Sequence, residues 1–374
     1  MCIRDSPGTA APRPPGTGRW DRLRAPAGFA AAAAALFLVA PLLLTDFRLG
    51  LLAKYLCFAI VAVGIALAWG RGGMLTLGQG LFFGLGGYAM AMHLELADAG
   101  PGGLPDFMLL YGDTDTLPWW WVPFAHPVVA LAAVLLLPMA VAAGIGLLVF
   151  RRRVRGAYFA ILSQALAAAF ALLLIGQQAT TGGTNGLTNF RGIFGYSLHD
   201  PVNRRMVYFV IAAVLLILVA LTRHLFLSRY GELLAAVRDS EERVRFLGYD
   251  PALVKLAAYT ASAGMAGVAG ALFVPAVGII SPAMIGIVPS IEFVIGAAIG
   301  GRASLPGAAL GAITVAWAQT TLSEQFPAGW TYFQALLFIV VIVFLPGGLA
   351  SLAHVLRRRC RLYTSNTADE AASV

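Results

Sequence analysis

The chain has 374 residues, of which 59% are hydrophobic and 12% are charged, and its mean hydropathy is +0.80. This composition excludes an ordinary soluble globular protein and predicts an all-α, polytopic membrane protein. The net charge of +8 is explained by the basic residues that membrane proteins retain on their cytoplasmic side, so we expect no nucleic-acid partner.

The two ends of the chain differ from its apolar middle. We expect residues 1–26 to form a disordered cytoplasmic tail, residues 27–352 a transmembrane domain, and residues 353–374 a basic tail. Residues 1–6 and 359–374 resemble translated sequencing-adapter read-through, so they are left out of functional reasoning. Cys57 falls in an apolar run, whereas Cys2 and Cys360 fall in the terminal segments, so no disulfide or metal site is indicated.

Apolar runs long enough to cross a bilayer, about 20 residues, recur along the chain. We expect about ten transmembrane helices, at residues 28–45, 51–69, 74–96, 126–150, 156–176, 206–227, 255–279, 287–300, 305–322 and 332–350. The eighth is short and the third is rich in glycine, so we expect that either can be broken or re-entrant.

The distribution of Lys and Arg predicts that both termini lie in the cytoplasm. With this orientation, 21 of the 26 basic residues fall on the inner side. The outer loop 97–124 supports it independently, because it holds four aspartates and no basic residue. The basic residues that fall on the outer side are Arg48, Lys54, Arg191, Arg204 and Arg205.

The inner loop 229–255 is the most polar stretch of the membrane domain, with ten charged residues. Its apolar residues recur at near-heptad spacing, and Gly248 and Pro251 are typical helix stops. We expect two short helices at the membrane surface, the second capped by Asp239 with Glu242 at its third position. Such a loop predicts a docking surface for a protein partner.

Three segments place polar groups where a small solute could contact them. The glycine-rich run from Gly72 to Met92 carries Thr76 and Gln79, and it favours either close helix packing or an unwound helix. The outer segment TTGGTNGLTNF carries Thr184 and Asn185, and it fits either a solute contact or an ordinary turn. Glu292 lies in an otherwise apolar helix, where it either lines a polar path or fixes two helices together.

Enzyme motifs are absent from the sequence. Its two lysines, Lys54 and Lys255, do not follow a phosphate-binding glycine pattern, and no H-E-x-x-H, C-x-x-C or G-x-S-x-G occurs. We therefore expect no catalytic residue and no cofactor bound by this chain.

Several motifs resemble those of one transporter family, the permeases of branched-chain amino acid and urea ABC importers. The similarity rests on GELLAAVRDSE and the following SAGMAGVAGAL, on GGMLTLGQGLFFGLGGY, on TGGTNGL, and on SIEF followed by GGRASLPGAALGA, and it covers residues 30–352. It departs from the family pattern at Ala303, where glycine is usual. The resemblance implies an inner-membrane permease that works by alternating access.

The partners implied by the resemblance are a second permease, two ATP-binding subunits that use ATP and Mg²⁺, a periplasmic solute-binding protein and membrane lipid. The residues expected to couple the chain to the ATPase are Gly231, Glu232, Ala235, Ala236, Arg238, Asp239, Glu242 and Gly248. Within the family, the outer loop with LPDFM and LPWWWVPF looks most like a urea permease. A branched-chain amino acid permease is the alternative, and an ion-coupled carrier is a third reading.

Overall fold

The computed structural model describes residues 19–100, 102–111, 116–154 and 156–326, together with Gly329, Tyr332, Phe333, Leu336 and Ile339. The chain divides into two compact units, one up to Thr45 and one from Asp46 onward. In the first unit, helix α1 (Arg19–Ala34) continues through the π-helical turn η1 (Ala35–Val39) into α2 (Ala40–Leu43).

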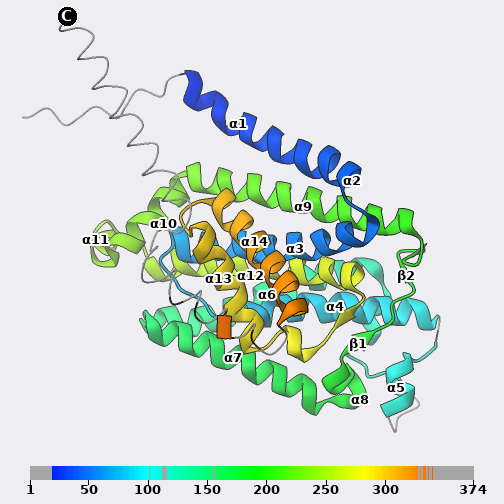
Figure 1. Cartoon of the computed structure of the whole chain (residues 1–374). Helices are drawn as coiled ribbons and strands as arrows, with labels where there is room; N and C mark the ends of the chain where they lie inside the picture. Colours follow the sequence, from blue (N-terminus) through cyan, green and yellow to red (C-terminus); the bar gives the residue numbers. More distant parts are fainter. Residues whose placement is uncertain are drawn as a thin grey trace, which may run out of the picture. The chain divides into compact units, whose positions relative to one another are not determined.

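The second unit is built from long helices with short elements between them (Figure 1). Its long helices are α3 (Asp46–Ile65), continued by the π-helical η2 (Ala66–Arg71), α4 (Gln79–Ala99), α6 (Pro127–Arg151), α7 (Ala157–Gly176), α9 (Pro201–Leu227), α12 (Pro251–Val277), α13 (Ile287–Gly300) and α14 (Leu305–Gln325). The short helices are α5 (Asp106–Tyr111), η3 (Val122–Ala125), α8 (Gln178–Thr181), η4 (Gly183–Asn185), α10 (Arg229–Asp239), α11 (Glu241–Phe246) and η5 (Pro282–Met284).

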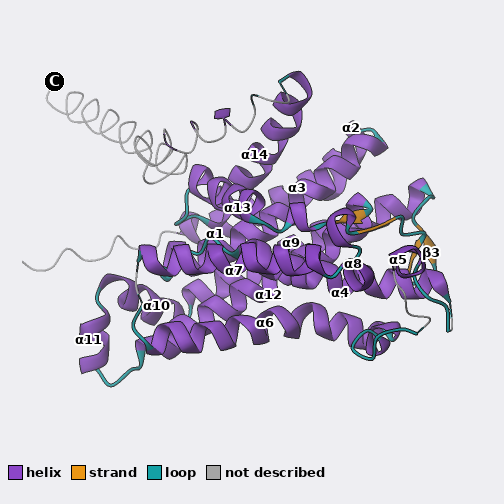
Figure 2. Cartoon of the chain, turned by 90° about the horizontal axis from the view of Figure 1, so that it is seen from below, coloured by secondary structure: helices purple, strands orange, loops and turns teal. Residues whose placement is uncertain are grey.

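The four strands have two residues each and form two antiparallel pairs. β1 (Leu187–Thr188) pairs with β4 (Ile279–Ile280), and β2 (Gly192–Ile193) pairs with β3 (Tyr196–Ser197). Figure 2 shows the strands gathered at the end of the helices opposite α10 and α11. They join connecting loops and form no layer of their own.

Six helices in the described part of the chain are long and apolar enough to cross a membrane: 46–71, 127–151, 157–176, 201–227, 251–277 and 282–300. The polytopic all-α prediction is therefore confirmed. Helices also occupy the first, third and ninth predicted spans, where α4 and α14 have 21 residues each, a length of about 31 Å. The tenth predicted span, 332–350, lies almost entirely outside the described residues.

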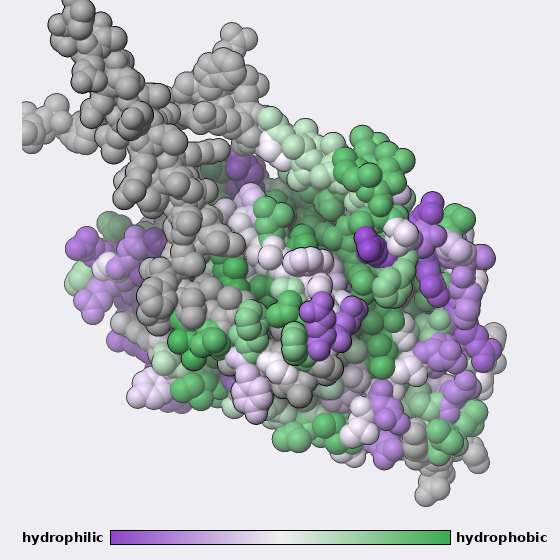
Figure 3. Space-filling model, viewed as in Figure 1, coloured by the Kyte–Doolittle hydropathy of each residue, from purple (hydrophilic) through white to green (hydrophobic). Residues whose placement is uncertain are grey.

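The helices differ in how much of their surface other helices cover. In the most apolar part of each helix, 78% of the residues are buried in α3 with η2 and 67% in α12. The corresponding share is only 22% in α6 and 33% in α7 and α9. The peripheral helices expose large apolar side chains such as Leu136, Leu148, Leu172 and Ile217. Figure 3 shows this apolar surface in the middle of the molecule. Polar residues gather at its two ends, over α10 and α11 at one and around β2 at the other. This distribution is the one expected for a helix bundle that is surrounded by lipid.

Glycines allow the central helices to touch backbone to backbone. A Cβ atom at Gly270 of α12 would overlap the carbonyl oxygen of Phe83 in α4, and one at Gly86 would overlap the carbonyl oxygen of Gly267. In membranes, such close approach takes the place of the hydrophobic effect as the source of helix association. The small residues that the sequence places in these two helices therefore fix the α4–α12 pair.

The outer loop 97–124 folds over the outer end of α4. Met92 and Leu96 of that helix form an apolar cluster with Met108 of α5, and Trp121 and Phe124 pack against it. The indole Nε1 of Trp121 donates to the carbonyl oxygen of Thr180, 3.1 Å away, in α8, the short helix that follows α7. The aromatic residues of this loop thus close the bundle between α4 and α7.

Candidate functional site

Two segments without α-helix enter the bundle from opposite ends and meet inside it. The first, residues 72–78, follows η2 and leads to the start of α4 at Gln79, five residues later than the sequence predicts. The second, residues 278–286, follows α12 and leads to the short helix α13. They meet at Gly80, where a Cβ atom would overlap both the carbonyl oxygen of Ile285 and the hydroxyl oxygen of Ser290.

The meeting point lies well inside the bundle, away from the ends of the long helices. Ser262, which contacts Gln79, is 11 residues from the inner end of α12, and Ser290 is 10 residues from the inner end of α13. At a rise of 1.5 Å per residue both lie about 15 Å from the inner ends of their helices. Broken helices that meet near the bilayer midplane are the arrangement that transporters use to present backbone and polar groups to a solute.

Serine hydroxyls from three helices hold the end of residues 72–78 and the first residues of α4. The amide of Leu77 donates to Ser163 Oγ of α7 at 3.0 Å, and the amide of Gly80 donates to Ser290 Oγ of α13 at 3.1 Å. Gln79 Nε2 donates to Ser262 Oγ of α12 at 3.0 Å. The sequence did not single out these serines, because hydroxyls are common in packed membrane helices.

Several buried polar atoms at this point lack a hydrogen-bond partner among the described residues. They are Thr76 Oγ1, Gln79 Oε1, and both side-chain amide atoms of Gln164, the neighbour of Ser163. Thr76 and Gln79 are completely buried. An unpaired buried polar group costs about 1–3 kcal/mol, so these atoms leave hydrogen-bonding capacity unused at the centre of the bundle. The segment shows both features that its sequence favours, because residues 72–78 are not α-helical and Gly86 packs against the backbone of α12.

Glu292 joins three helices. Its Oε1 accepts a hydrogen bond of 2.8 Å from Gln319 Nε2 on α14, and it interacts electrostatically with Lys54 on α3. The carboxylate is half-buried on α13. Of the two readings from sequence, the structure shows the link between helices, while a contact with solute remains a prediction.

Thr184 and Asn185 lie in the outer connection and are both exposed. Gly182, Gly183 and Gly186 have positive φ angles of 78°, 59° and 70°, so the segment forms the glycine-dependent turn that its composition predicts. Asn185 lines an outer cavity with Glu95, Asp98, Asp106 and Arg191, separate from the buried cluster at Gln79.

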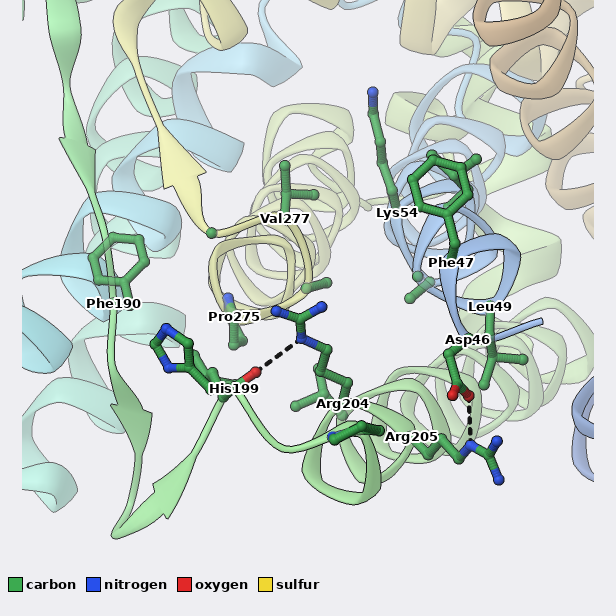
Figure 4. Close-up of a pocket in the computed structure, with 18 of the residues that line it drawn as sticks. Asp46, Phe47, Leu49, Lys54, Phe190, His199, Arg204, Arg205, Pro275 and Val277 are labelled. Carbon is green, nitrogen blue, oxygen red and sulfur yellow. Dashed lines mark hydrogen bonds and ion pairs between the residues drawn. The ribbon is translucent and has the colours of Figure 1, made fainter.

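A second outer cavity, of about 420 Å³, lies between the outer ends of α3, α9 and α12 (Figure 4). Three of its lining side chains are cationic, Lys54, Arg204 and Arg205, and among the described residues the only carboxylate that lines it is Asp46. Asp46 Oδ1 accepts from Arg205 Nε at 2.6 Å, and Arg204 Nε donates to the carbonyl oxygen of Leu198 at 2.8 Å. The sequence flagged these cations only as exceptions to the orientation rule.

The inner loop forms two short helices, α10 and α11, as predicted. Leu234, Val237 and Val244 are buried, whereas Phe246 and Leu247 at the tip are 91% and 75% exposed. Lys255 forms an ion pair with Glu241, which anchors α11 to the start of α12. Two large apolar side chains that are exposed at the tip of a folded loop are typical of a protein-contact surface.

The tyrosine of α10 also anchors the loop. The Tyr230 hydroxyl donates to the carbonyl oxygen of Val254 at 2.7 Å, and burial raises the pKa of Tyr230 to about 12. The phenol is therefore protonated at all physiological pH values and remains a donor. This hydrogen bond fixes α10 against the first turn of α12.

Six of the eight residues predicted to couple to an ATPase are exposed, namely Glu232, Ala236, Arg238, Asp239, Glu242 and Gly248. Gly231 is buried and helical, and a Cβ atom there would lie 2.5 Å from Leu225 O and 2.6 Å from Phe226 O. Gly231 therefore allows the start of α10 to pack closely against the end of α9. Ala235 is half-buried.

The predicted cap of α11 is wrong. Asp239 is the last residue of α10, and its Oδ1 accepts from Arg238 Nε at 2.9 Å. Ser240 occupies the N-cap position of α11 and makes no side-chain capping bond. Gly248, with φ of 87°, lies just beyond the end of α11, as predicted.

Two arginines connect α10 to the unwound segment. Arg238 Nη1 donates to the carbonyl oxygen of Gly70 at 3.0 Å, and its side-chain stem fills the space beside Gly73, whose φ is 71°. In return, Arg71 Nε donates to the carbonyl oxygen of Gly231 at 3.2 Å, and its guanidinium lies 5.5 Å from the centre of the Phe226 ring. The loop and residues 70–73 thus hold each other through two reciprocal arginine contacts.

Comparison with known proteins identifies the class to which this arrangement belongs. The family described as the branched-chain amino acid transport system permease component matches residues 47–345. The chain belongs to this family, and it is an ABC-importer permease of the LivM type. With the six apolar helices, this makes it a multi-pass protein of the inner membrane.

Two curated relatives carry the name high-affinity branched-chain amino acid transport system permease protein LivM. The one from Salmonella typhimurium is 28% identical over 248 residues, and the one from Escherichia coli is 27% identical over 248 residues. Each alignment covers 60% of this chain and 52% of the relative, so the chain spans about half the length of the curated relatives it matches. No solved structure matches.

Proposed function

We propose that the chain is the membrane-spanning subunit of an ATP-driven importer for branched-chain amino acids. Both relatives are named for that solute, whereas nothing in the comparisons favours the urea specificity expected from the outer loop. The chain contributes the solute path and the docking surface. ATP and Mg²⁺ are used by separate ATP-binding subunits, and a second permease and a periplasmic binding protein complete the importer.

Its strongest support is the physical connection between the docking loop and the polar centre. Residues 70–73, which Arg238 and Arg71 hold, lead directly into the backbone that carries Thr76 and Gln79. A rigid movement of α10 therefore shifts the backbone that carries the unpaired oxygen atoms. Binding energy at one site can shift a second site only through such a shared two-state element.

In the proposed cycle, the ATPases close on ATP and move α10 and α11 together. The arginine contacts transmit this movement to the unwound segment, which changes the exposure of Gln79 Oε1 and Thr76 Oγ1 to the two sides of the membrane. The solute's polar groups satisfy these atoms during passage, and its apolar side chain faces the surrounding alanine and glycine surfaces. The solute path assigned to Thr76, Gln79 and Glu292 is part of this proposal.

The proposal is tested by uptake into proteoliposomes that contain the complete importer, with labelled L-leucine and labelled urea supplied in parallel. We expect leucine uptake that requires ATP inside the vesicles and is unaffected by collapse of a proton gradient. Urea uptake without leucine uptake would restore the urea reading. Leucine uptake driven by a proton gradient without ATP would assign the chain to the ion-coupled carriers.

A further inference from the structure

The basic residues that fall on the outer side are not scattered. Of the five exceptions to the orientation rule, Lys54, Arg204 and Arg205 line one cavity of about 420 Å³. Lys54 lies on α3, whereas Arg204 and Arg205 are neighbours on α9, 150 residues later in the chain, yet the three surround the same space (Figure 4). Outer cations oppose the charge bias that orients the protein, so their convergence calls for a role at the cavity itself.

The charges around this cavity do not cancel. Asp46 is paired with Arg205, and Lys54 is attracted to Glu292 on α13. Arg204 is held by one hydrogen bond, from Nε to the carbonyl oxygen of Leu198, and no carboxylate among the described residues pairs with it. In Figure 4 its terminal nitrogen atoms point toward the open space beside Pro275. Two donors of a guanidinium are thus presented to the cavity, in the fork geometry that matches a carboxylate.

The remaining walls are largely apolar. Phe47, Leu49, Phe190, Pro275 and Val277 line the space between the charged groups. A volume of about 420 Å³ lies in the usual range for small-molecule sites, which combine apolar walls with a few placed polar groups. An aliphatic side chain fits this lining, whereas a solute without one leaves it uncovered.

We propose that this cavity is a binding site for the carboxylate of a small aliphatic amino acid, with Arg204 as its principal ligand. The inference rests on the proposed function and adds to it a recognition step at the outer mouth of the permease, before the solute reaches Gln79. A guanidinium and an apolar wall together select an amino acid over a neutral amide such as urea.

The site is tested on the purified full chain in phosphatidylcholine nanodiscs, without ATPase or binding protein. Saturation-transfer NMR measures the affinity for L-leucine and for L-leucinamide, which differ only at the carboxylate. We expect leucine to bind about tenfold more tightly than leucinamide, because a charge-assisted hydrogen bond is worth about 1.4 kcal/mol or more. Arg204→Gln abolishes this difference and Arg204→Lys retains part of it, whereas Arg48→Gln, an exposed arginine outside the cavity, leaves it unchanged.

Three results would overturn the site. The first is equal binding of leucine and leucinamide, or no binding of either. The second is a preference for the carboxylate that survives in the Arg204→Gln variant when its size-exclusion profile is normal. The third is loss of leucine binding when phosphatidylglycerol is added, since this would assign the cavity to a lipid phosphate. None of these measurements needs ATP, so they fail or succeed independently of the uptake experiment that tests the transport function.

Discussion

The side-chain amide of Gln79 has one end occupied and the other unpaired. Its Nε2 is held by Ser262, and its Oε1 has no partner in the described part of the chain. Gln79→Leu keeps the approximate volume and removes both groups. We expect ATP-dependent uptake to fall about tenfold, which corresponds to the loss of one hydrogen bond to the solute, about 1.4 kcal/mol.

The readout for Gln79→Leu is the initial rate of uptake at several solute concentrations. Ser262→Ala is the matched control, because it removes the holder of Gln79 and leaves the amide in place. If Gln79→Leu transports at the wild-type rate, the unwound segment is not on the solute path.

Glu292 gives a different prediction, since its partners are within the protein. Glu292→Gln keeps an oxygen to accept the bond from Gln319 and removes the charge that attracts Lys54. We expect the variant to assemble normally but to lose thermal stability, because Lys54 is left as an uncompensated cation inside the membrane domain. Restoration of the melting temperature by Lys54→Met in the same chain is the decisive measurement, and no restoration would disprove the pairing.

At the scale of elements, the connection between α10 and residues 70–73 is the most consequential contact. Arg238→Met removes the bond to Gly70 and keeps the stem that lies on Gly73. We expect ATP hydrolysis by the assembled importer to continue while uptake per ATP falls several-fold, because the ATPase still docks and the movement is no longer transmitted. Arg243→Met, an exposed arginine of α11, is the control. Equal losses in hydrolysis and uptake would show that Arg238 acts in docking alone.

The tip of the inner loop is expected to carry the docking energy. Phe246 and Leu247 are among the most exposed large apolar residues of the described chain, and buried aromatic anchors usually dominate the energy of an interface. Phe246→Asp is predicted to weaken co-purification of the ATPase at least tenfold, without changing the amount of permease in the membrane. Tyr249→Asp, at a residue that is 55% exposed, gives a graded comparison. Full recruitment by Phe246→Asp would remove the tip from the interface.

Sequence patterns predicted the elements better than their junctions. Apolar length located the helices, and the charged island located α10 and α11, because both signals are local. The start of α4 was misplaced at residue 74, since Met74, Leu75 and Leu77 are as apolar as helix residues. The contacts that hold them outside a helix are tertiary, namely the bonds that the amides of Leu77 and Gly80 donate to Ser163 and Ser290 and the tight fit at Gly80. The reciprocal arginine contacts were equally hidden, because their partners are backbone carbonyls about 160 residues away.

For the whole molecule, the predicted orientation remains to be measured. Single cysteines at Trp119, in the outer loop, and at Arg243, in α11, lie at exposed positions of opposite ends of the helices, in a chain whose Cys57 is buried. We expect an impermeant maleimide added outside spheroplasts to label the first and not the second. Labelling of both from one side would show that the number of spans between them is even.

The outer cations have a consequence for biogenesis. Each one must be carried across a membrane whose interior is negative, which costs about 2.3 kcal/mol per charge at 100 mV. The chain offsets part of this cost where a cation is paired with a carboxylate, as Arg205 is with Asp46 at the start of α3. Among the cations that line the cavity, Arg204 pairs with no carboxylate in the described part of the chain, so its translocation works directly against the potential. We therefore expect α9 to insert with Arg204 on the outer side more completely in a depolarised cell than in an energised one.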